Sequence, residues 1–135
     1  MVQSPITSVI RANTNRSQSE PQFSVWPGTV RDPSTQQANA ASRNDLVANQ
    51  MDQIRANLQS RLYHIFTMET DYFDMSSDAS IDDSLEAVHD TVHVTVGSGG
   101  HMSEVPYAAF DPIFWLHHAY GSLPLPNCTI NVYSA

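Results

Sequence analysis

The sequence predicts a mainly α-helical protein whose first 43 residues form a long irregular segment. The stretch from Asn44 to Met68 carries apolar residues at spacings of three and four, as one face of a helix requires. Two later stretches each begin with a residue that can cap a helix, Ser84 and Asp111. Residues 1–43 are instead rich in Ser, Gln, Asn and Pro and contain Pro-Gly and Asp-Pro turn signals. We therefore expect three helices that pack together, with little or no sheet.

The longest predicted helix runs from Asn44 to Met68. Its apolar side chains form one stripe that consists of Val47, Met51, Ile54, Leu58, Leu62 and Ile65. Ser42 or Asn44 can accept hydrogen bonds from the first free amide groups of this helix. We expect the helix to end before the acidic and Ser-rich stretch 69–83.

A second, shorter helix is predicted from Leu85 to about Val94. Ser84 stands immediately before it and offers a side-chain oxygen as its N-cap. Gly97 opens the run GSGG, and such a run ends a helix because glycine readily leaves the helical conformation. A glycine-rich loop should therefore follow this helix.

The third predicted helix follows the string DPIFWLHH. Asp111 can cap its first turn, and Pro112 suits the first helical position because the missing amide hydrogen has no partner there in any case. The tail 120–135 has two prolines two residues apart and no helical period. We expect this helix to stop soon after His118.

Composition excludes several classes of protein. Fourteen acidic against six basic residues give a net charge of -8, which opposes phosphate backbones and anionic membranes, so we expect no nucleic acid and no membrane partner. Cys128 is the single cysteine, so an internal disulfide and a thiolate-rich metal site are excluded. No apolar run is long enough to cross a bilayer, and the N-terminus lacks the apolar core of a secretory signal, so the default localisation is cytoplasmic.

Clustered histidines are the main functional signal. Five of the six histidines fall within thirty residues: His89, His93, His101, His117 and His118. His89 and His93 stand four apart on a predicted helix, so both project from one face within reach of a single metal ion. A third ligand must come from another element, and the last helix can present His117 or His118. Adjacent positions point about 100° apart, so only one of this pair should be a ligand.

The spacing of four alone also fits an exposed polar face. Glu86, His89, Asp90 and His93 share an arc of about 100°, and such a stripe usually faces water. The His-His pair favours the metal site, because it closes the apolar run IFWL, where a buried imidazole without a partner costs about 1–3 kcal/mol. The alternative for the pair is one core histidine bonded to a backbone carbonyl beside an exposed neighbour. Imidazole ligands suit copper, zinc, iron or nickel. The HExxH string is absent, which counts against the helix of a zinc protease.

Residues Ser84 to Ala119 resemble the second copper region of fungal tyrosinases and polyphenol oxidases. The segment reads SLEAVHDTVHVTVGSGGHMSEVPYAAFDPIFWLHHA. It contains, in the order of that family, a helix with HxxxH, a loop with Gly-His-Met, and Tyr-Ala-Ala-Phe-Asp-Pro-Ile-Phe before a His-His pair. The stretch from Thr29 to Met68 is similar to the family more loosely. The resemblance implies part of a tyrosinase-type copper helix bundle.

The family pattern also implies roles for individual residues. His89 and His93 match the first two copper ligands, and His118 matches the third. Glu86 matches a glutamate that holds a water near the coppers. Asp90 follows the first ligand, where many active members have an asparagine that helps to orient that water; an ionised Asp accepts hydrogen bonds but cannot donate them.

The same pattern predicts one copper site in this chain, whereas the family uses two. His101 and His117 match positions that are not ligands, and no histidine precedes His64, although the histidines of the first copper should lie upstream. We therefore expect one copper ion, a copper-binding domain at 44–119, and a tail at 120–135 that does not match the family. The chain would then be a truncated or partial member.

Two functions follow from this resemblance. The first is an oxidoreductase that converts monophenols and o-diphenols to o-quinones with dioxygen, so that a small phenol and dioxygen are the expected partners. The second is a non-catalytic fragment that binds a single metal ion, which the missing first site favours. A third interpretation is a small helical protein whose histidines are structural. Binding of metal and oxidation of an o-diphenol distinguish the three.

Overall fold

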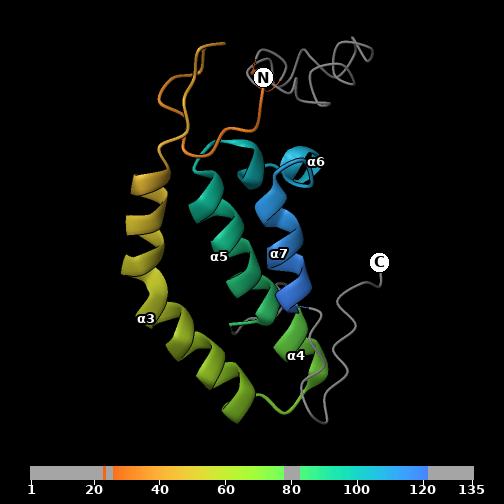
Figure 1. Cartoon of the computed structure of the whole chain (residues 1–135). Coiled ribbons are helices and arrows are strands. Elements are labelled where there is room, and N and C mark those ends of the chain that lie inside the picture. The colour runs from red at the N-terminus through yellow and green to blue at the C-terminus, as the bar shows by residue number, and fades with distance from the viewer. Residues whose placement is uncertain (1–22, 24–25, 78–82, 122–135) are drawn as a thin grey trace.

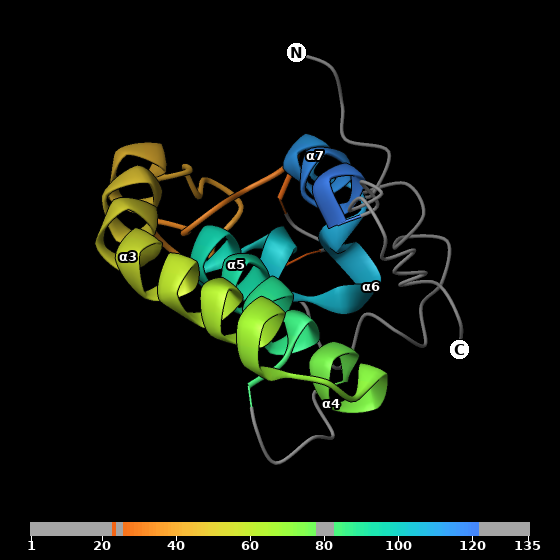
Figure 2. The same cartoon turned by 90° about the horizontal axis from the view of Figure 1, so that it is seen from below.

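Three helices form the body of the computed structural model, which describes residue 23 and residues 26–77 and 83–121. They are α3 (Asn44–Met68), α5 (Leu85–Gly97) and α7 (Pro112–Gly121). Helix α5 lies between the other two in both views of the chain (Figures 1 and 2). No β-strand occurs within these described ranges, where the only pairing of this kind is an isolated bridge between Pro33 and Ser42. The prediction of a mainly helical fold is therefore confirmed.

Three short elements were not predicted. Helix α4 (Tyr72–Ser76) follows α3, and the 3₁₀ turn η1 (His101–Ser103) and helix α6 (Val105–Ala108) connect α5 to α7. The side chain of Asp71 accepts hydrogen bonds from two backbone amides and so caps α4. None of the described helices is long and apolar enough to span a bilayer.

The bounds of α3 agree with the prediction, but its N-cap does not. Arg43 is the N-cap residue and makes no side-chain capping bond. The hydroxyl of Ser42, one of the two expected caps, instead accepts a hydrogen bond from the backbone N–H of Arg31 at 3.1 Å. The Ser42 hydroxyl therefore pairs with the N-terminal segment and does not cap α3.

Helix α5 starts as predicted and ends three residues later than predicted. The Ser84 hydroxyl accepts a hydrogen bond from the Ala87 N–H at 3.1 Å and caps the helix. The helix ends where Ser98 adopts a left-handed conformation with φ of 46°. Gly97 remains helical and buried, because its missing side chain is used for packing: a Cβ there would lie 2.1 Å from the Ser103 nitrogen.

The last helix begins as predicted. The Asp111 carboxylate accepts a hydrogen bond from the Ile113 N–H at 3.0 Å, and Pro112 is the first helical residue. The helix continues to Gly121, a little beyond His118. The expected non-helical tail lies outside the described residues from position 122 onward, as does most of the N-terminal segment before position 26.

Two small clusters of buried side chains make the core. The first joins the N-terminal segment to α6 and consists of Phe23, Trp26, Val30 and Tyr107. The second lies between α3, α5 and the connecting turn and consists of Val47, Val96, Met102 and Ala108, with Ile113 and Phe114 of α7 packed against it. Residues 26–43 are irregular, as expected, but they belong to the packed structure. The division into domains at 43 and 119 stays a prediction.

Candidate metal centre

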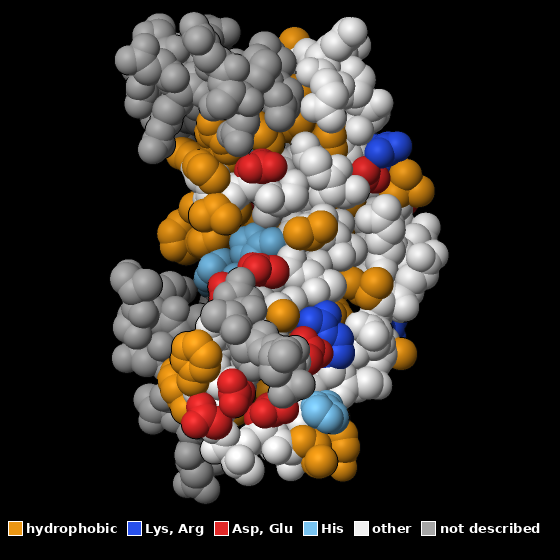
Figure 3. All heavy atoms as spheres, turned by 180° about the vertical axis from the view of Figure 1, so that it is seen from behind, with side chains coloured by type: hydrophobic (Ala, Val, Ile, Leu, Met, Phe, Trp, Pro, Cys, Tyr) orange, Lys and Arg blue, Asp and Glu red, His pale blue; other side chains and the backbone are white. Residues whose placement is uncertain are grey.

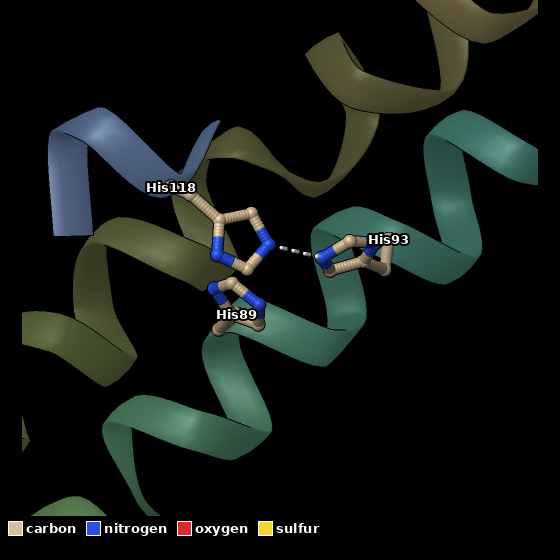
Figure 4. Close-up of side chains that lie close together, drawn as sticks. All are labelled: His89, His93 and His118. Carbon is tan, nitrogen blue, oxygen red and sulfur yellow. Dashed lines mark hydrogen bonds between the residues drawn. The ribbon is translucent and has the colours of Figure 1, made fainter. Parts of the chain in front are cut away.

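Three histidines from two helices converge on one point. His89 and His93 project from α5, and His118 reaches them from α7 (Figure 4). One ring nitrogen from each residue lies within 4.8 Å of those of the other two. The Nε2 atoms of His93 and His118 are 3.1 Å apart. The predicted convergence of these three side chains is confirmed.

Local sequence accounts for the position of each ring. The spacing of four places His89 and His93 one turn apart on α5, with ring centroids 4.7 Å apart. Helix α7 is fixed at its start by Asp111, whose buried carboxylate binds Arg31 through two hydrogen bonds of 2.7 and 2.5 Å. This two-point contact joins the N-terminal segment to the helix that carries His118.

A backbone carbonyl orients the ring of His93. Its Nδ1 lies 2.9 Å from the carbonyl oxygen of Met102 in η1, so Nδ1 carries the proton and donates it. The Nε2 atom then keeps its lone pair and points toward His118. In the metal-free protein His118 donates from Nε2 to that lone pair. A metal ion would replace this proton between the two rings.

The structure separates the two adjacent histidines of α7. His117 lies 4.2 Å from His89, ring centroid to ring centroid, and its Nε2–H donates to the His89 carbonyl oxygen at 3.2 Å. His118 instead joins the cluster, with Phe114 packed against its ring at 3.8 Å. Of the two, only His118 belongs to the group of ring nitrogens that could share one metal ion, and the prediction that only one of the pair is a ligand stays a prediction. The backbone-bonded histidine of the alternative interpretation is His117.

Burial favours the neutral form of the His89, His117 and His118 rings by lowering their pKa values. The pKa of His89 is lowered from 6.5 to about 3, mainly by burial and to a smaller extent by the neighbouring His117, His93 and His118. The pKa values of His117 and His118 are also lowered, mainly by burial. Neutral imidazoles have lone pairs available for a metal ion.

The geometry suits one small cation. Two imidazoles that hold one ion tetrahedrally at about 2.0–2.1 Å have nitrogens about 3.3 Å apart. The separation of 3.1 Å between His93 and His118 is close to that value, so a modest movement of His89 would complete a trio. The donor set contains nitrogen alone, which fits copper, zinc, iron or nickel. Each of the three histidines is partly buried. Seen from behind, histidine side chains lie at the surface beside hydrophobic and acidic ones (Figure 3).

The other residues named from the sequence lie outside the trio. Glu86 is partly buried and Asp90 is exposed, both on α5. His64 is exposed on α3. His101 is fully buried and bonds to the backbone of Val30.

Sequence reasoning missed two supports of the site. The carbonyl of Met102 orients His93, and Arg31 binds the residue that caps α7. A backbone carbonyl leaves no signal in a sequence. The arginine lies 80 residues from its partner, so only the folded chain brings the two together.

Comparisons with known proteins agree on one family. The family model described as the common central domain of tyrosinase matches residues 3–121. Polyphenol oxidase 4 of Agaricus bisporus is 36% identical over 106 residues, which is 73% of this chain and 17% of that protein. Tyrosinase of Neurospora crassa is 36% identical over 103 residues, 71% of this chain and 15% of that protein.

Solved structures give the same result. The structure of latent and active mushroom tyrosinase matches with a TM-score of 0.67 and 33% identity, over 77% of this chain and 28% of that one. Recombinant mushroom tyrosinase matches with a TM-score of 0.65 and 32% identity, over 77% of this chain and 20% of that one. The chain spans less than a fifth of the length of the curated fungal relatives that match most of it.

Proposed function

The chain belongs to the tyrosinase family, and on that premise we propose that His89, His93 and His118 hold one copper ion. The observation that carries the proposal is the approach of three ring nitrogens to within 4.8 Å of one another. Nitrogen donors alone leave zinc, iron and nickel open, and membership of the family selects copper. The hydrogen bond from His93 to a carbonyl supports it further, because metal-bound histidines commonly donate their other N–H in this way.

We propose one ion per chain because the other histidines have different surroundings. His64 is exposed on the outer helix, His101 is buried against Val30, and His117 donates to a carbonyl. Within the described part of the chain, the trio on α5 and α7 is the one group of three side chains that could hold a metal ion. The two-copper centre of the family would therefore need a second set of ligands beyond these residues.

Glu86 and Asp90 are proposed to orient a water beside the metal. Glu86 lies one turn before His89 on α5, and Asp90 lies one turn before His93. Both can accept hydrogen bonds when ionised, so either can hold a water by its hydrogens. The carboxylate at position 90 cannot donate, and we expect proton removal from a phenol to depend mainly on Glu86.

The activity proposed for a complete centre is oxidation of monophenols and o-diphenols to o-quinones with dioxygen. Bound copper would supply the redox chemistry, and this chain would supply three partly buried imidazoles and the partly buried Glu86. For these 135 residues alone we propose single-metal binding without turnover. The reason is that dioxygen takes two electrons from a pair of coppers in the family's reaction, and one trio holds one copper.

The test is a titration of the purified chain with Cu²⁺, followed by an assay of o-diphenol oxidation. We expect about one equivalent bound tightly and oxidation no faster than by free copper. His93→Ala should lose tight binding, because two ligands no longer enforce a geometry. His64→Ala is the matched control and should bind as the wild type does. The proposal of a single, non-catalytic site would be overturned if two coppers bound per chain or per dimer and o-diphenol oxidation required His89 and His93.

A further inference from the structure

His101 makes two hydrogen bonds with the backbone of one distant residue. Its own N–H donates to the carbonyl oxygen of Val30 at 3.0 Å, and its Nδ1 accepts from the N–H of Val30 at 3.0 Å. Because Nδ1 accepts, the proton of the neutral ring lies on Nε2. The side chain has no exposed surface, and its ring packs against Phe23 and Trp26 with centroids 5.4 and 5.3 Å away. We call this pair of bonds the Val30–His101 clamp.

The clamp holds the turn that orients a member of the trio. His101 is the first residue of η1, and the carbonyl of the next residue, Met102, accepts the Nδ1–H of His93 at 2.9 Å. Met102 is itself fully buried. A continuous chain of contacts therefore runs from Val30 through His101 and the Met102 carbonyl to the ring of His93.

Two glycines allow this close packing. A Cβ at Gly100 would lie 2.1 Å from the Val30 carbonyl oxygen, and a Cβ at Gly97 would lie 2.1 Å from the Ser103 nitrogen. The end of α5, the turn η1 and the N-terminal segment thus touch through their backbones. Backbone contacts of this kind leave the Met102 carbonyl little freedom to move relative to α5.

We propose that His101 is a positioning residue for the metal site, which acts through the Met102 carbonyl to fix the ring of His93. This inference rests on the proposed function, because it assigns His101 a task in binding the same ion. It concerns a buried side chain that does not touch the trio. Its effect is to keep the proton of His93 on Nδ1 and the lone pair of Nε2 directed at the metal.

The first test needs no metal. Nitrogen NMR of the histidine rings in the metal-free chain distinguishes a proton on Nδ1 from one on Nε2. We expect His93 to carry its proton on Nδ1 in the wild type, and to become a mixture of both forms in His101→Leu. His101→Asn should restore the wild-type form, because its side-chain oxygen can accept from the Val30 N–H in the place of Nδ1.

The second test is affinity for Cu²⁺. His101→Leu should bind Cu²⁺ about 10–100-fold more weakly, the usual effect of losing an outer contact, while the number of ions bound stays the same. His101→Asn should regain most of the affinity. Val30→Ala is the matched control: it removes a buried side chain from the same place but keeps both backbone groups of the clamp, so its affinity should stay close to that of the wild type.

Three results would overturn the proposal. One is a wild-type His93 with its proton on Nε2, which can be observed even if His101→Leu does not fold. Another is a folded His101→Leu chain in which His93 still carries its proton on Nδ1 and the Cu²⁺ affinity equals that of Val30→Ala. The third is His101→Asn behaving like the leucine variant. If the wild type binds no Cu²⁺, the proposed function fails, and the NMR comparison still decides whether His101 fixes the ring.

Discussion

The imidazole of His117 lies against that of His89, with ring centroids 4.2 Å apart, and its Nε2–H donates to the carbonyl oxygen of the same residue. This contact uses a nitrogen that His117 would otherwise offer to a metal. It also leaves His118, turned about 100° further around α7, to face the two histidines of α5. The helix geometry therefore gives the two neighbours different tasks.

Substitution of the two neighbours by glutamine should give different results. In His117→Gln the side-chain amide can still donate to the His89 carbonyl, so we expect about one equivalent of Cu²⁺ to bind. In His118→Gln the lone pair of an imidazole is lost, and tight binding should be lost with it. Equilibrium dialysis against Cu²⁺ measures both. If His118→Gln still bound Cu²⁺ tightly and His117→Gln did not, His117 would be the third ligand.

Acid should destabilise the metal-free fold as the pH falls below about 6.5. The pKa of His89 is lowered from 6.5 to about 3 by burial, so the unfolded chain binds a proton more readily between these values. The stabilising contribution is therefore fully present above pH 6.5 and is lost as the pH falls toward 3. Urea unfolding in steps from about pH 7.5 to about pH 4.5 should show a falling free energy of unfolding.

A variant pair locates the source of this pH dependence. His89→Gln removes the titrating ring, so its free energy of unfolding should fall less steeply with acid. His64→Gln removes an exposed ring of α3 and should keep the wild-type slope. Equal slopes for the wild type and His89→Gln would show that protonation of this ring does not limit stability in acid.

The ion pair between Arg31 and Asp111 should stabilise the fold strongly. The Asp111 side chain is fully buried, so Arg31→Ala leaves a carboxylate without its partner, and we expect a loss of about 3 kcal/mol. Asp111→Asn should cost less, because the amide oxygen can still cap α7 through the Ile113 N–H. Chemical denaturation measures both. The prediction would be contradicted if Arg31→Ala lowered the free energy of unfolding by less than Arg55→Ala, which breaks the exposed pair with Asp52.

A methyl group at Gly97 should not be tolerated. The added Cβ would lie 2.1 Å from the Ser103 nitrogen, and both backbones would have to separate, so we expect Gly97→Ala to cost about 1–3 kcal/mol. An alanine is otherwise favourable in a helix, and an effect of propensity alone would have the opposite sign. Gly28→Ala is the control, since a Cβ there meets nothing within 4 Å. Thermal unfolding of the two variants should separate them clearly.

Much of the helical fold was predictable because it depends on local patterns. The apolar stripe predicted helix α3 and the acidic stretch 69–83 predicted its end, while Ser84 and Asp111 predicted the starts of α5 and α7. The ends of helices were harder: α5 continues through Gly97 because close packing against η1 requires a residue without a side chain there. The short elements α4, η1 and α6 have too few residues to show a period.

The trio could be named from the sequence by combining helical spacing with the family resemblance. A separation of four places His89 and His93 on one face, and the family pattern selects His118 from the final pair. The supports of the trio could not be named in the same way. The Met102 carbonyl carries no sequence signal, and Arg31 reaches Asp111 across 80 residues.

By itself the sequence determined where the three longest helices lie, which face of α5 carries histidines, and which family the chain resembles. The helices and the histidine face depend on residues within one or two turns of each other, and short-range geometry is the same in every helix. The resemblance depends on the order of motifs along the chain. Only the tertiary structure decided that His118 meets His93, that His117 binds a carbonyl, and that the Val30–His101 clamp lies behind the site. Those contacts join segments far apart in the chain, and the packing of buried groups selects them.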